Sequence, residues 1–191
     1  MEKIAHEGKK FENINYAEKK LVNREFLNVE FTNCDFTKSD LCNTDFTDCT
    51  FKDCNFSLSI LDSTKLNDVR FIGCKLMGLD FSKCNSFLFS TSFKDCQLDY
   101  ASFFKMKIKK TKFTGCSLKE VDFAEADLSL AAFDNCDLLN AAFIKTNLEK
   151  ADFRAARNYS FDPELNKITN AKFSLGGVAG LLLKYNIHIE Q

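Results

Sequence analysis

A five-residue repeat constrains this chain more than any other feature. Between Val29 and Leu76 every fifth residue is Phe or Leu, the residue two places before it is small, and the positions between are mostly polar. A period of five matches neither the 3.6 residues of a helix nor the two residues of an ordinary strand. A fixed period of self-similar units is typical of a solenoid, in which each unit stacks on its neighbours.

A longer period of 20 residues is superimposed on the first. Two columns of residues share it, and both slip from 20 to 22 residues at the same place. The columns are Phe11, Phe31, Phe51, Phe71, Phe93, Phe113, Phe133, Phe153 and Phe173, and Cys34, Cys54, Cys74, Cys96, Cys116 and Cys136. We therefore expect an all-β fold, a square-sectioned parallel β-helix of about eight coils that stack ~4.7–4.9 Å apart. The slip predicts a bulge of two extra residues between Phe81 and Phe93.

These repeats resemble the pentapeptide repeat family, which implies a right-handed quadrilateral β-helix. The resemblance covers residues 26–157, which we take as the repeat domain. Residues 1–25 are interpreted as an N-terminal cap with an irregular first coil. The inward slot, which is the position two residues before each repeated Phe or Leu, holds Lys9, Lys19 and Arg24 there. An unpaired charge cannot enter an apolar core. Residues 158–174 are predicted to form an irregular closing coil, and residues 175–191 a helix and strand module.

Eight of the nine cysteines occupy the small inward slot, where they act as small apolar residues. The ninth, Cys42, falls on an outward position and is expected to react with thiol reagents. No Cys-x-x-Cys pair is present and the two histidines are far apart, so no metal site or cofactor is predicted. Reduced thiols, a polar N-terminus and the absence of a long apolar run predict a soluble cytoplasmic protein.

The C-terminal residues change in pattern. Val178, Leu181, Leu182 and Tyr185 recur at helical spacing, and residues 187–189 alternate like a short strand. The tail either seals the end of the coil or forms a two-fold dimer contact, and both can hold. It resembles the C-terminal dimerisation module of Qnr-type quinolone-resistance proteins. The residues predicted to form a homodimer interface are Val178, Leu181, Leu182, Tyr185, Ile187 and Ile189.

No motif indicates catalysis. The sequence lacks a Gly-rich phosphate loop, a nucleophile elbow and a His–carboxylate pair, so we do not expect an enzyme. Aspartates are frequent just before the Phe or Leu that recurs every fifth residue, which we call the centre of each repeat. Because an Asp side chain can accept a hydrogen bond from the nearby backbone, most of them are expected to stabilise corners.

The charge is unevenly distributed. Residues 25–100 hold 12 acidic and 7 basic side chains, residues 101–120 hold 1 and 6, and residues 121–155 hold 7 and 3. A lysine belt therefore separates two acidic zones. It consists of Lys105, Lys107, Lys109, Lys110 and Lys112. The belt is either a solvated surface or a contact for an acidic partner, and direct nucleic-acid binding is disfavoured because the acidic zones would repel phosphates.

The predicted bulge carries three apolar residues, Phe87, Leu88 and Phe89, which cannot all point inward. Either the extra ring packs on a neighbouring coil, or the segment is an exposed apolar knob for a partner.

Three functions remain open, of which the third is a purely structural protein without a specific ligand. The resemblance to Qnr and MfpA-like proteins implies a dimeric DNA mimic that binds DNA gyrase or topoisomerase IV and protects it from quinolones. The candidate partner-facing acids are Asp40, Asp45, Asp48, Asp68, Asp80 and Asp122. The alternative is a scaffold for another protein partner, supported by outward apolar residues at Ile60, Phe87, Phe89, Phe104 and Ile144. A continuous acidic ridge favours the first function, and a ridge interrupted by lysines favours the second.

Overall fold

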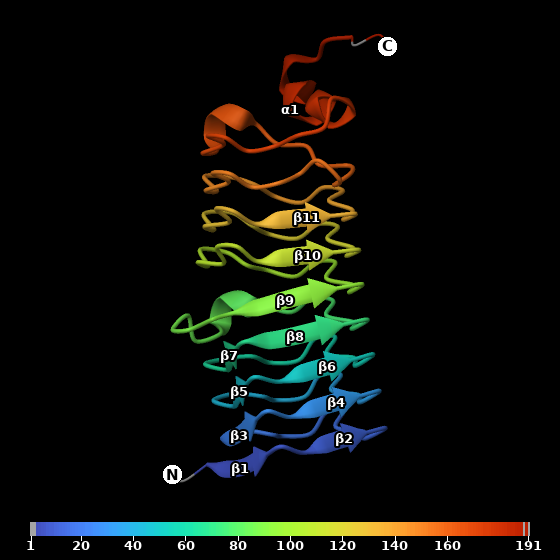
Figure 1. Ribbon diagram of the computed structural model, residues 1–191, viewed down its shortest axis with the longest axis vertical. Coiled ribbons are helices and arrows are strands. Elements are labelled where there is room, and N and C mark those ends of the chain that lie inside the picture. Colours follow the sequence, from blue (N-terminus) through green and yellow to red (C-terminus); the bar gives the residue numbers. More distant parts are fainter. Residues whose placement is uncertain (1–2, 189, 191) are drawn as a thin grey trace.

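The computed structural model describes residues 3–188 and 190, and it shows a rod of stacked turns with the termini at opposite ends (Figure 1). Two parallel sheets lie on neighbouring sides of the rod: one covers the first four turns, the other continues to residue 134, and the turns beyond it are joined by isolated bridges. One sheet contains β1 (Ile4–Glu7), β3 (Arg24–Leu27), β5 (Asp45–Thr47) and β7 (Lys65–Asn67). The other contains β2 (Lys10–Glu12), β4 (Glu30–Thr32), β6 (Thr50–Lys52), β8 (Val69–Ile72), β9 (Thr91–Lys94), β10 (Lys112–Thr114) and β11 (Ala132–Asp134).

The register confirms the 20-residue period and its slip. Phe31 pairs with Phe51 in the parallel ladder, and Phe71 pairs with Phe93 across the two extra residues. The other two sides of the rod are held by single parallel bridges, such as Asp35 with Asn55. Backbone pairing on all four sides therefore fixes the vertical columns, except at the bulge, where among the described residues no bridge joins 84–90 to 105–110 of the next turn.

Stacked aromatic rings fill the interior. Phe31 and Phe51 stack with ring centroids 4.8 Å apart, and rings on adjacent sides meet edge to face, as Phe46 does with Phe51 at 5.3 Å. The eight cysteines of the inward slot are buried, as predicted. The Cys49 thiol donates to the carbonyl of Phe26 at 3.3 Å, and burial raises its pKa to about 11. These thiols pack as neutral groups, which explains how a narrow core tolerates so many of them.

Corners follow from backbone conformation at the second residue after each centre. That residue has a left-handed φ in nearly every repeat, for example 53° at Asn33 and 54° at Asp48. Asn, Asp and Gly adopt this region at low cost, which accounts for their frequency there. At Gly73 the constraint is stronger, because a Cβ atom would overlap the carboxylate of Asp53 on the previous turn.

Aspartates before the centres stabilise the turns as predicted. Asp35 accepts the amide hydrogen of Thr37 at 2.9 Å and Asp122 that of Ala124 at 2.8 Å, and the same bond recurs on the other two sides in later turns, at Asp127 and Asp152. Each bond satisfies an amide that no ladder uses. Asp45 differs, because it lies in β5 and forms ion pairs with Lys3 and Lys65.

The bulge lies between the 3-10 turn η1 (Phe81–Lys83) and β9, and its loop projects from the side of the rod (Figure 1). Phe87 and Leu88 are exposed, whereas Phe89 is half-buried and packs edge to face on Phe81 at 6.3 Å. One ring of the bulge thus packs on the core and two apolar side chains are exposed, while a partner for the exposed pair stays a prediction. The amide of Ser90 rejoins the ladder by donating to the carbonyl of Leu66 at 2.9 Å.

Backbone pairing at the N-terminal end begins before residue 26. Ile4 pairs with Arg24 and Phe11 with Phe31, so the first turn stacks in register. Its charged inward positions turn toward solvent, where Lys9 is exposed and Arg24 is half-buried. The end of the rod is thus continuous with the repeats in its backbone but not in its core.

The C-terminal segment closes the other end. After the 3-10 turn η2 (Pro163–Leu165) come η3 (Gly176–Val178), α1 (Ala179–Leu182) and η4 (Leu183–Tyr185). Leu181 is buried against the last turns, which supports a capping role. Ile187 and His188 form no strand in the single chain, and Ile189 lies outside the described residues. Among the described residues, no helix has the length and apolar character that crossing a bilayer requires.

Candidate functional site

One side of the rod carries four aspartates that form no ion pair with a described residue, although Lys20 is the ladder partner of Asp40 on the turn before it and its charge lowers the pKa of the Asp40 carboxyl. Asp40 pairs with Ile60, and Asp80 is linked through Ser102 to Asp122. These residues therefore share one side of the rod, which is one of the two sides held by single bridges. Asp62 joins them, since its carbonyl accepts the amide of Asn43 on the turn before it. We call Asp40, Asp62, Asp80 and Asp122 the acidic face.

The acidic face is neutralised by no ion pair with a described residue, whereas the ion pairs of the rod lie on its other sides and corners and at the C-terminal end. Asp40, Asp80 and Asp122 each spend one oxygen on a turn hydrogen bond, from Cys42, Ser82 and Ala124 respectively. All three side chains are half-buried, and Asp80 also accepts a hydrogen bond from the Ser82 hydroxyl. The face therefore presents carboxylates whose charge is free to attract a cationic partner.

Local hydrogen bonds keep Asp40 ionised. The Cys42 thiol beside it lowers the pKa of the Asp40 carboxyl, although partial burial opposes the effect. In return, burial and the hydrogen bond to Asp40 raise the pKa of Cys42 to about 11. Cys42 is half-buried whereas the other eight cysteines are buried, so it stays the thiol that we expect to react with thiol reagents, and its raised pKa slows that reaction at neutral pH.

The acidic face is sparser than DNA. From Asp40 to Asp122 the chain makes four turns, which span about 19 Å along the rod axis. Four carboxylates over that length give roughly one charge per 5 Å, against about one per 1.7 Å for duplex DNA. Ile60 and Ile144, which are exposed, and the half-buried Phe104 lie on the same side. The surface is thus a mixed acidic and apolar one rather than a phosphate-like lattice.

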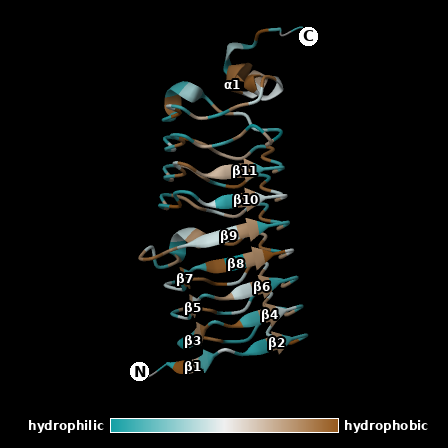
Figure 2. Ribbon diagram, in the orientation of Figure 1, coloured by the Kyte–Doolittle hydropathy of each residue, from teal (hydrophilic) through white to brown (hydrophobic). Residues whose placement is uncertain are grey.

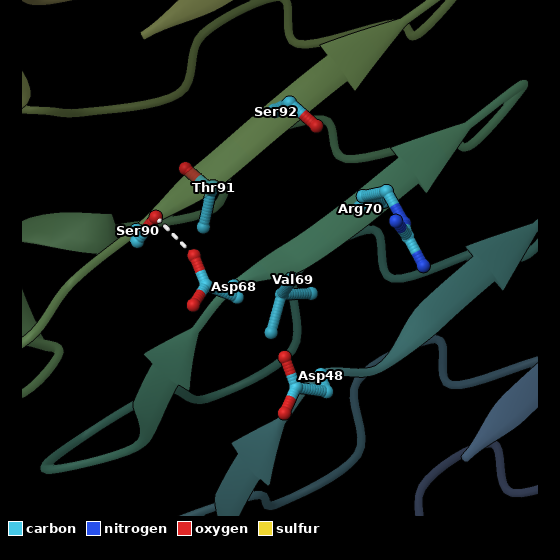
Figure 3. A pocket seen from close by; sticks show the side chains of 7 residues that line it. All are labelled: Asp48, Asp68, Val69, Arg70, Ser90, Thr91 and Ser92. Carbon is cyan, nitrogen blue, oxygen red and sulfur yellow. Dashed lines mark hydrogen bonds between the residues drawn. The ribbon is translucent and has the colours of Figure 1, made fainter. Parts of the chain in front are cut away.

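The other predicted acids lie elsewhere. Asp45 is neutralised between Lys3 and Lys65, at 2.7 and 3.1 Å. Asp48 and Asp68 stack one above the other at the corner before β6 and β8, beside a hollow of about 410 Å³ (Figure 3). Asp68 accepts a hydrogen bond from the Ser90 hydroxyl at 2.9 Å. The six predicted acids therefore do not form one ridge; three belong to the acidic face, and Asp62 was missed.

The lysine belt is exposed but passes around the other sides of the rod. Lys105 and Lys109 form ion pairs with Glu125 and Asp127 of the next turn, at 3.5 and 3.2 Å. Lys105 also lies 4.7 Å from the ring centroid of Phe104, at the edge of the acidic face. The belt therefore reaches that edge and does not cross it.

An apolar cluster surrounds the C-terminal end of the rod. Of the predicted dimer residues, Leu181 is buried, Val178 and Leu182 are half-buried, and Tyr185 and Ile187 are exposed. Leu175 and Leu183, which the helical pattern did not select, are more exposed still, at 94% and 65%. The tail thus exposes several apolar side chains, and Figure 2 shows hydrophobic residues in α1.

Two ion pairs hold this tail against the last turn. Lys184 contacts Asp162 at 2.7 Å and Glu164 at 2.8 Å, and the hydroxyl of Tyr185 donates to Glu164 at 3.0 Å. The tail is therefore positioned by the rod, with Leu181 buried and Leu175, Leu183 and Ile187 left exposed.

The sequence matches the pentapeptide repeat region over residues 24–103 and 86–162, which is most of the chain. The chain belongs to the pentapeptide repeat family. A search of curated proteins gives no match. Among solved structures, QnrB1, described as a plasmid-mediated fluoroquinolone resistance protein, aligns with a TM-score of 0.53 at 21% identity and covers 98% of both chains.

Other pentapeptide repeat structures align less closely. HetL, involved in heterocyst differentiation regulation in the cyanobacterium Nostoc, has a TM-score of 0.41 at 16% identity, covering 90% of this chain and 87% of its own. A protein of the Arabidopsis thaliana thylakoid lumen has a TM-score of 0.32 at 19% identity, covering 64% and 70%. At these identities the likeness establishes the fold, a parallel β-solenoid with a short C-terminal helix.

Proposed function

We propose that this pentapeptide repeat protein is a non-enzymatic, cytoplasmic DNA mimic that binds DNA gyrase or topoisomerase IV through the acidic face and protects the enzyme from quinolones. The observation that carries the proposal is the set of four carboxylates without ion pairs, aligned along one side of a rigid rod. A partner with a basic DNA-binding saddle attracts such a surface by long-range electrostatics. The likeness of the fold to QnrB1 and the free thiols, which suit a reducing compartment, are consistent with it.

The charge density sets the strength of the interaction. With about a third of the charge density of DNA, the acidic face competes poorly by charge alone. The apolar side chains on the same face, Ile60 and Ile144, supply contacts that DNA lacks. We therefore expect binding that weakens with salt but less steeply than DNA binding does.

We propose in addition that the rod acts as a homodimer joined through the C-terminal apolar cluster. Leu175, Leu183, Tyr185 and Ile187 are exposed at that end and would be covered by a second copy. A two-fold contact there would bring two rods end to end and extend the acidic face to twice its length, which a duplex-binding enzyme would recognise as a longer segment.

The deciding assay is DNA supercoiling by gyrase, with and without a quinolone, in the presence of the full-length protein. The test variant replaces the four aspartates of the acidic face by asparagine, which removes the charge and, at Asp40, Asp80 and Asp122, keeps the oxygen that accepts the turn hydrogen bond. The matched control replaces Asp35, Asp127, Asp137 and Asp152, which make the same turn bonds on other sides.

We expect the wild-type protein to inhibit supercoiling or protect it from quinolone at micromolar concentration. The acidic-face variant should need at least about tenfold more protein, and the control should stay within about twofold of wild type. No effect of the wild-type protein, or equal effects of the two variants, would reject the proposal.

A further inference from the structure

The exposed bulge and the lysine belt lie on successive turns of the same part of the rod. Asp80 pairs with Ser102 and Ser92 pairs with Lys112, so the segments between these pairs, 81–91 and 103–111, are stacked one above the other. The apolar tip of the bulge therefore lies on the turn next to that of the lysine belt. Neither the acidic face nor the C-terminal cluster includes these residues.

The tip of the bulge is exposed yet held in place. The side chains of Phe87 and Leu88 are 73% and 61% exposed. The amide of Phe87 donates to the side chain of Asn85 at 2.9 Å, Leu88 takes a left-handed φ of 59°, and Phe89 is anchored on Phe81. Two apolar side chains thus project from a fixed loop, and a fixed loop loses little entropy when it binds.

The cations next to it are available. Lys107, Lys110 and Lys112 form no ion pair within residues 3–188 and 190, and the pairs of Lys105 and Lys109 join exposed side chains. Exposed pairs of this kind are weak, so an incoming carboxylate can displace them. Lys107 and Lys109 flank the inward residue Ile108, a spacing of two residues, or about 6.6 Å in extended backbone.

We propose that the bulge tip and the lysine belt form a docking surface for an extended acidic segment of another protein. Its carboxylates, at alternate positions, would pair with the belt, and one or two apolar side chains would pack on Phe87 and Leu88. This goes beyond the proposed topoisomerase interaction, which uses a different side of the rod and the opposite charge.

The lysine belt extends over only one turn along the rod axis, which favours an extended peptide over a wider polyanion as its ligand. The cations occupy one turn, while Glu125 and Asp127 lie on the next turn and Asp68 on the turn below the bulge. A single extended strand is about as wide as one turn, roughly 4.8 Å. A DNA duplex or an anionic membrane is wider and would meet these carboxylates as well as the lysines.

The probe is a fluorescein-labelled ten-residue peptide with Glu at alternate positions and Val or Leu between them, and its counterpart with Gln for Glu. Fluorescence anisotropy with the full-length protein measures binding. The belt variant is Lys107→Gln/Lys110→Gln/Lys112→Gln, with Lys145→Gln/Lys150→Gln/Lys172→Gln as its control. The tip variant is Phe87→Ser/Leu88→Asn, with Leu130→Asn as its control, because Leu130 is also exposed and has a φ of 63°.

We expect the Glu peptide to bind with a Kd below about 100 μM at low salt and the Gln peptide at least about tenfold more weakly. The belt and tip variants should each weaken binding about fivefold or more, and the controls should not. The proposal is overturned if the peptide does not bind, if the controls weaken binding equally, or if phosphatidylserine vesicles or a 20-base-pair duplex bind more tightly. Any of these outcomes leaves the proposed function untouched, because the supercoiling assay tests the acidic face.

Discussion

The central ring stack predicts a large and position-dependent cost for removing one ring. Phe113 is fully buried and stacks on Phe93 at 5.2 Å and on Phe133 at 5.3 Å. It also meets Phe103 and Phe123 edge to face, both at 6.0 Å. Phe113→Ala removes all four contacts and leaves a cavity that the backbone ladders prevent from closing. We expect the free energy of unfolding to fall by about 3–5 kcal/mol.

An end-of-column ring provides the comparison. Phe11 is half-buried and stacks on one neighbour only, Phe31, at 5.2 Å. Phe11→Ala should therefore cost about 1–2 kcal/mol, less than half the central value. Phe113→Leu, which places in the column a residue that other sides of the rod accept, should cost roughly 1 kcal/mol.

Urea unfolding followed by far-UV circular dichroism measures these changes, because the chain has no Trp to report on the core. A loss of 3–5 kcal/mol is a third or more of the stability of an ordinary domain, so the central variant should unfold at clearly lower urea. If Phe113→Ala and Phe11→Ala cost the same, or if both cost less than about 1 kcal/mol, the stacked column does not carry the stability assigned to it.

Three further predictions concern a corner, a thiol and the tail. Gly73→Ala should lower the free energy of unfolding by about 2–3 kcal/mol, because its Cβ would meet a carboxylate of the previous turn. Gly8→Ala, at a position with a similar φ and open space, should lower it by about 1 kcal/mol. Equal losses in denaturant titrations would contradict this. The alkylation rate of Cys42 should keep rising to about pH 11, and Asp40→Asn should shift that profile to lower pH; a plateau by pH 9 would show an unperturbed thiol. Truncation after Phe173 should convert a dimer to a monomer in sedimentation, and two monomers of equal behaviour would reject the dimer module.

The acidic face shows how much site information the sequence contained. Once the 20-residue period is known, Asp40, Asp80 and Asp122 fall in one column, and sorting outward residues by side would have added Asp62 and removed Asp48. What the sequence did not reveal is pairing. Lys3 neutralises Asp45 across two turns, a contact between residues 42 positions apart that no local pattern encodes.

The amino-acid sequence by itself determined the solenoid, its register and the place of the bulge. The reason is that inward positions must pack on their counterparts one turn away, so burial repeats the same residue types at a fixed interval. Only the tertiary structure decided which outward charges remain unpaired, which of three adjacent apolar residues faces solvent, and which side of the tail is free. Outward side chains make no such repeated contact. Their environment depends on corners and neighbouring turns that are brought together only in the folded chain.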